Sequence, residues 1–107
     1  MTRFTLHPLA LADYETIIRY SRRQWGVEQA RRYGHALIDG MRQCADGTPL
    51  VKAVKGIAGQ DGPIFVLRCK MHKLYFIRPQ DDRALIIAIL SQHMDQPARL
   101  AERMEAL

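Results

Sequence analysis

The stretch ALIIAIL, residues 84–90, decides which fold this sequence favours. All of its residues are apolar, and Ile86, Ile87 and Ile89 are β-branched, which suits the pleated surface of a sheet. A strand without polar side chains needs apolar cover on both of its faces. We therefore expect residues 83–90 to form a central strand with other parts of the chain packed against it.

Two further strands are expected directly before this one. Residues 64–70 and 73–78 contain β-branched and aromatic side chains, and only the dipeptide at 71–72 separates them. That spacing predicts a tight hairpin. A pair of aspartates at 81–82 marks the turn into the central strand. The second half of the chain is therefore expected to form antiparallel strands.

Helical periodicity runs through residues 8–45 and is broken once. Pro8 fits the first turn of a helix, where no backbone N–H is needed. Gly26 supplies the left-handed residue that ends such a helix, and the periodicity resumes at Ala30. It stops near Ala45, before the turn-forming DGTP. The sequence therefore predicts a helical hairpin bent at Gly26. Before the bend, one helical face carries Leu11, Tyr14, Ile18 and Trp25.

Together these elements predict an α+β fold. A short strand at residues 3–7 and a C-terminal helix from Pro97 to about Met104 complete the order β-α-α-β-β-β-α. Residues 50–63 are expected to be a loop, with a short strand near 50–54 left open. The helical hairpin packs on one face of a mostly antiparallel sheet, because neither layer buries its apolar side alone. With 107 residues, the chain is expected to be one domain, 1–107.

The charge balance favours an acidic partner. The chain has 16 Lys and Arg against 11 Asp and Glu, a formal net charge of +5 and a pI near 9.6. A solvated basic surface is the open alternative. We expect no secretory signal and no membrane span, because no long apolar run occurs. Cys44 and Cys69 are the two cysteines, which suits free thiols in the cytoplasm.

Four stretches, in this order along the chain, resemble the ParE branch of the RelE/ParE toxins of bacterial toxin–antitoxin systems. Residues 11–26 and 28–33, LADYETIIRYSRRQWG and EQARRY, resemble the family's two helices around a Trp-Gly bend. HKLYFIR at 72–78 is similar to its central strand, and ILSQHMD at 89–95 to its closing strand and turn. Two positions depart from the family pattern, which often has histidine at Ser91 and arginine at His93.

This resemblance implies a RelE/ParE-like fold and a cytoplasmic toxin that needs no cofactor. It implies that the toxin inhibits DNA gyrase and blocks replication, and that it is not an enzyme. It also implies a hetero-oligomer with a cognate ParD-type antitoxin, whose acidic C-terminal segment neutralises the toxin. Operator DNA would be reached only through the antitoxin.

The candidate antitoxin-binding residues lie around the bend. Arginines there are either solvated helix ends, placed to complement the helix dipole, or a landing site for an acidic segment. The single tryptophan either closes the hairpin against the sheet, the interpretation that we favour, or anchors the antitoxin. The candidates are Arg22, Arg23, Trp25, Arg31 and Arg32.

The candidate target-binding residues lie at the C-terminus. Leu100, Met104 and Leu107 are spaced to pack inward, and Arg99 and Arg103 share another helical face, which is either solvated or in contact with the target. The candidates are Met94, Asp95, Arg99 and Arg103.

Two other functions remain open. The RelE branch cleaves mRNA on the ribosome, which requires basic groups and a proton-transfer group close together. Arg68, Arg78 and His93 are the candidates, supported by Lys52 and Lys55, and the two arginines are expected to share one face of the sheet. The late tyrosine that RelE-type enzymes often carry is missing. The third function is an inactive relative that only binds a partner.

A metal site is not expected. Cys69 and His72 have C-x-x-H spacing, but no second pair completes four ligands. A buried thiol and a turn histidine explain the two residues better.

Overall fold

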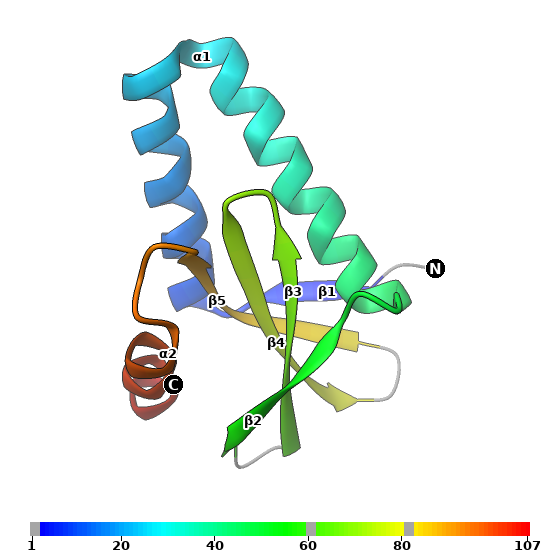
Figure 1. The fold of residues 1–107 in the computed structure, drawn as a ribbon. Helices are drawn as coiled ribbons and strands as arrows, with labels where there is room; N and C mark the ends of the chain where they lie inside the picture. Colours follow the sequence, from blue (N-terminus) through cyan, green and yellow to red (C-terminus); the bar gives the residue numbers. More distant parts are fainter. Residues whose placement is uncertain (1–2, 60–61, 81–82) are drawn as a thin grey trace.

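The structure, a computed structural model, describes residues 3–59, 62–80 and 83–107. Within them, β1 to β5 form one sheet in the order β1-β5-β4-β3-β2 (Figure 1). β1 runs parallel to β5, and the other neighbouring strands are antiparallel. The elements are β1 (Phe4–Leu6), α1 (Pro8–Asp46), β2 (Lys52–Gly59), β3 (Gly62–Cys69), β4 (His72–Gln80), β5 (Arg83–Ser91) and α2 (Gln96–Ala106).

β5 lies inside the sheet and is covered on both faces, as its apolar run predicts. Ile86 and Ile89 belong to a core cluster that includes Leu37 of α1. Ile87 belongs to a second cluster that includes Leu100 of α2. The pairing with β4 is irregular after Ile86, so Ile87 and the next residue both face the second cluster. The predicted α+β fold is therefore confirmed, with one core between the sheet and α1 and another beneath α2.

The helical hairpin is also confirmed. α1 consists of two helices that meet at Gly26, whose φ of 87° and ψ of 171° are not helical. The two helices approach closely at Gly34, where a Cβ atom would lie 2.8 Å from the Tyr14 hydroxyl oxygen. Ser21 and Ala30, which are also small, are buried. Small side chains therefore allow the two halves of α1 to pack against each other.

Two predictions about the strands need correction. Residues 50–63 are not mainly a loop, because Lys52–Gly59 forms the edge strand β2, paired with β3. Glycines and lysines hide its alternation, and its pairing is irregular between Ala53 and Ala58. The β3–β4 turn consists of residues 70–71, one residue earlier than predicted, since His72 pairs with Cys69. The turn predicted at 81–82 lies outside the described residues.

α2 begins one residue before Pro97 and ends at Ala106, close to the predicted bounds. Leu100 is buried and Met104 is half-buried, as expected. The prediction that Leu107 packs inward is wrong, because the residue follows the helix end and is exposed. No helix in the described part of the chain is both long and apolar enough to cross a membrane.

Candidate binding surfaces

The bend of the helical hairpin is exposed. In Figure 1 it extends past the β3–β4 turn, beyond any part of the sheet that could cover it. Trp25 is 58% exposed, and its ring meets the edge of Tyr20 at a centroid distance of 5.9 Å. The prediction that Trp25 belongs to the core is therefore wrong, because the hairpin is longer than the sheet beneath it.

Basic side chains lie on both sides of the bend along the chain. Arg31 is 3.1 Å from Glu28 in an exposed ion pair. Arg22, Arg23 and Arg32 are exposed and form no ion pair or hydrogen bond with any residue that the structure describes. Their positive charge is therefore not neutralised within the described chain, and this surface can attract an anionic partner.

A groove of about 440 Å³ runs between the two helices of the hairpin. Tyr14, Ile18 and Val27 give it apolar walls, while Arg22 and Arg31 bring positive charge to it. The lining residues in full are Tyr14, Ile18, Arg22, Val27, Ala30, Arg31, Gly34 and His35. An apolar side chain flanked by carboxylates matches this groove chemically.

The C-terminal candidates divide into exposed and structural residues. Met94 is 44% exposed, and Arg99 is exposed beside Glu102 at 3.6 Å. Asp95 is the N-cap of α2, since its carboxylate accepts a hydrogen bond of 3.3 Å from the Ala98 backbone N–H.

Arg103 is not a solvated side chain. Its two terminal nitrogens donate to the two carboxylate oxygens of Asp13, each at 2.8 Å, and one also donates to the Ile87 carbonyl at 2.9 Å. The Arg103 and Asp13 side chains are only 17% and 18% exposed. The hydrogen bonds that Arg103 donates to Asp13 raise the pKa of Arg103 above its ordinary value. The sequence predicted that Arg99 and Arg103 share a face that is either solvated or in contact with the target, but only Arg99 is exposed.

The three ribonuclease candidates do not converge. Arg68 donates to the Gln92 side chain at 2.9 Å, while Arg78 donates to the Cys44 and Ala45 carbonyls at the end of α1. In the pairing of β3 with β4, Arg68 lies opposite Lys73, so these two side chains are on the same face of the sheet. Lys73 and Arg78 are an odd number of residues apart in β4. Because side chains alternate along a strand, the two arginines point to opposite faces of the sheet.

The remaining candidates of this group are exposed. His93 is exposed after the end of β5, and Lys52 and Lys55 are exposed on β2. The prediction that Arg68 and Arg78 share a face is wrong, because the two side chains point to opposite faces of the sheet.

Cys69 and His72 have other partners than a metal ion. The Cys69 thiol donates to the Ala36 carbonyl at 3.3 Å, and burial raises the thiol pKa. His72 Nδ1 is 2.6 Å from the Tyr33 hydroxyl. Among the residues that the structure describes, no three potential ligands from His, Cys, Asp and Glu come together.

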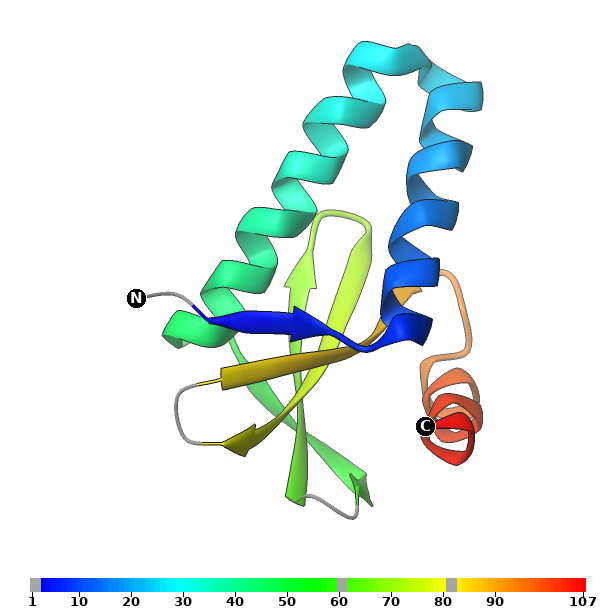
Figure 2. The same ribbon diagram turned by 180° about the vertical axis from the view of Figure 1, so that it is seen from behind.

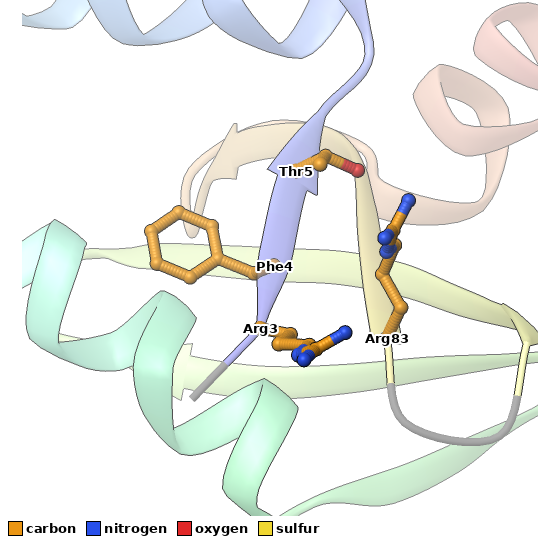
Figure 3. A pocket seen from close by; sticks show the side chains of 4 residues that line it. All are labelled: Arg3, Phe4, Thr5 and Arg83. Atoms are coloured by element: carbon orange, nitrogen blue, oxygen red, sulfur yellow. The ribbon is translucent and has the colours of Figure 1, made fainter. Parts of the chain in front are cut away.

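Two basic residues at the edge of the sheet were not among the predicted candidates. Arg3 directly precedes β1 and Arg83 begins β5, and both line an open pocket of about 390 Å³ (Figure 3). Their side chains extend on the same side of β1, while Phe4 points away from them toward the helices. Only the parallel pairing of β1 with β5 brings these two residues together.

Comparison with solved structures defines the class of fold. A chain described as "Chromosomal ParDE TA system from P. aeruginosa" matches with a TM-score of 0.58 and 16% sequence identity, covering 85% of this chain and 96% of that one. At this identity the likeness shows the fold alone, which is that of a small helical hairpin on a mixed sheet.

Sequence comparison then shows the family. The family described as "ParE toxin of type II toxin-antitoxin system, parDE" matches residues 4–96. "Toxin ParE" of Escherichia coli is 35% identical over 105 residues, which cover 98% of this chain and 99% of that protein. The chain belongs to the ParE toxin family of type II toxin–antitoxin systems. The resemblance seen in the four sequence stretches is thus confirmed.

Proposed function

We propose that this toxin inhibits DNA gyrase by binding rather than by catalysis, and that a cognate ParD-type antitoxin neutralises it. Membership of the ParE toxin family, matched over residues 4–96, is the observation that carries this proposal. The separation of Arg68 and Arg78 onto opposite faces of the sheet supports a binding mechanism. The exposed C-terminal residues Met94 and Arg99 are the proposed target contacts.

The test of this target is a reaction of purified toxin with gyrase and plasmid DNA. Stabilisation of a gyrase–DNA intermediate predicts that linear, cleaved plasmid accumulates with increasing toxin. A matched control contains toxin and plasmid without gyrase, in which the plasmid stays intact. Normal supercoiling at excess toxin would contradict the proposal, and transcripts cut on translating ribosomes would point instead to mRNA cleavage.

The exposed end of the helical hairpin is the proposed antitoxin site. The partner we propose is the acidic, amphipathic C-terminal segment of the antitoxin, which folds as it binds. Three features support this choice: the un-neutralised arginines, the exposed Trp25 and the apolar groove between the helices. Arginine and tryptophan are enriched among the residues that dominate binding energies at interfaces. The residues concerned are Arg22, Arg23, Trp25, Arg31 and Arg32.

A further inference from the structure

Little apolar surface attaches α2 to the rest of the molecule. Of its residues only Leu100 is buried. A hydrogen bond of 2.9 Å from the Tyr75 hydroxyl to the Gln96 side chain adds one polar contact near its start. An isolated helix of this length is marginal in water. The position of α2 therefore depends on the few contacts that join it to the body of the protein.

The pair Asp13–Arg103 is the most specific of these contacts. Arg103 comes from α2 and Asp13 from the start of α1. The two terminal nitrogens of Arg103 donate to the two carboxylate oxygens of Asp13. Each also bonds the backbone of β5: Arg103 donates to the Ile87 carbonyl, and Asp13 accepts from the Ile89 N–H at 2.9 Å. The pair therefore joins α1, β5 and α2 at one half-buried point.

Such a pair fixes orientation more than it adds net stability. A buried ion pair gains little over well-packed apolar residues, because both charges lose their hydration. A bidentate arginine–carboxylate contact is directional, however, and each additional backbone hydrogen bond restricts it further. The apolar contact of Leu100 is not directional and allows α2 to rotate, whereas the Asp13–Arg103 pair does not.

The pair also lies beside the exposed residues proposed to meet the target. Asp13 and Arg103 line a groove of about 430 Å³, together with Met94 and Arg99. Figure 2 shows α2 next to the end of β5 and the start of α1, the elements that the pair connects. A rotation of α2 would therefore move Arg99 relative to Met94, which precedes the helix.

We propose that Asp13 and Arg103 are positioning residues for toxicity: they orient α2 so that Met94 and Arg99 form one target-binding surface. This inference rests on the proposed function. The pair itself does not touch the target. It is separate from the hairpin bend, since the Asp13–Arg103 contact lies near the start of α1 and the bend lies at Gly26.

The test compares three variants with a matched control. R103M removes the charge, R103K keeps it without the bidentate geometry, and D13N alters the pair from the other side. R42M is the control, because it removes an exposed arginine that forms an ion pair with Asp39. Each variant is assayed for gyrase inhibition, antitoxin affinity and amide hydrogen exchange in α2.

We expect R103M and D13N to inhibit gyrase about tenfold or more weakly than the wild type. The reason is that binding groups need to be held within about 0.5 Å of the productive geometry. R103K should be intermediate. Amide exchange in α2 should accelerate in all three variants, while antitoxin affinity stays within about twofold. R42M should behave like the wild type. Gyrase inhibition by R103M equal to that of the wild type would overturn the proposal.

A second variant separates orientation from folding. D13L/R103M replaces the pair by apolar side chains, which often preserves stability. We expect this variant to fold and bind antitoxin but still inhibit gyrase poorly; full inhibition would show that the pair only stabilises the fold and would overturn the proposal. If the wild type itself does not inhibit gyrase, the proposed target is wrong, and growth arrest after induction then provides the same comparison of variants.

Discussion

At the scale of single residues, a hydrogen-bonded chain connects α1 to the β3–β4 turn. The Met71 N–H donates to the Tyr33 hydroxyl oxygen at 3.2 Å, so the Tyr33 O–H is available to donate to His72 Nδ1 at 2.6 Å. An accepting Nδ1 requires the neutral imidazole with its proton on Nε2. Burial lowers the pKa of His72 and raises the pKa of Tyr33, so both side chains stay uncharged near neutral pH.

This arrangement predicts a pH-dependent stability. Because the pKa of His72 is lower in the folded state than its ordinary 6.5, the unfolded state binds more protons between these two values. The contribution of His72 is complete above about pH 6.5 and is lost as the pH falls toward the lower folded pKa. The free energy of unfolding, measured with urea between pH 8 and pH 5, should therefore decrease more in the wild type than in H72N.

The Y33F variant is the companion control for this prediction. It removes the donated hydrogen bond but leaves a titrating histidine, so its pH dependence should stay closer to that of the wild type than to that of H72N. Equal pH dependence in the wild type and H72N would show that burial of His72 contributes nothing measurable to stability.

At the scale of elements, the helical hairpin is held at one end and exposed at the other. Its lower part packs on the sheet, where a Cβ at Gly40 would lie 2.8 Å from a Leu74 methyl carbon. Its bend has no sheet beneath it, and Trp25 and Val27 are exposed there. An exposed aromatic residue in a basic environment suits a binding surface better than a core.

The substitution W25A distinguishes these two roles. Because Trp25 is exposed, its removal should change the free energy of unfolding by no more than about 0.5 kcal/mol. Antitoxin affinity should fall by about tenfold or more, as for an interface anchor. Calorimetric titration with the antitoxin and urea unfolding measure the two effects.

L50A is a matched control for W25A, since Leu50 is a large exposed apolar residue outside the hairpin. It should leave antitoxin affinity unchanged. A strongly destabilised W25A protein with normal antitoxin affinity would contradict the assignment of Trp25 to the binding surface.

At the scale of the whole molecule, charge governs how a partner approaches. The formal net charge of +5 attracts an acidic segment from a distance, and the cluster of arginines at the hairpin bend directs it to one surface. We therefore expect the association rate with the antitoxin to fall steeply as the ionic strength rises.

Two double variants separate local from overall charge. R22Q/R23Q and R42Q/R99Q each remove two positive charges, the first at the bend and the second elsewhere. Stopped-flow association rates should fall, and lose part of their salt dependence, much more for R22Q/R23Q. Equal effects of the two variants would mean that net charge alone steers the antitoxin.

Features that depend on neighbouring residues could be predicted from the sequence. Pro8 begins the first helix and Gly26 ends it, because both residues restrict or permit particular backbone geometries. The apolar run of β5 requires cover on both faces of the strand. The edge strand β2 was missed, since glycines interrupt its pattern and only pairing with β3 defines it. The family motifs then implied a RelE/ParE-like arrangement of the predicted elements.

Site residues depended more on tertiary structure. Arg99 and Arg103 have equivalent places in the helical pattern, yet one is exposed and the other bonds Asp13 from the far end of the chain. Trp25 looks like a core residue from its helical face, but the length of the hairpin leaves it in solvent. Local propensity and apolar periodicity were thus sufficient for the layers and for the elements other than β2. Which charges are paired and which aromatic side chains are exposed depends on contacts between distant segments, and only the folded arrangement brings those segments together.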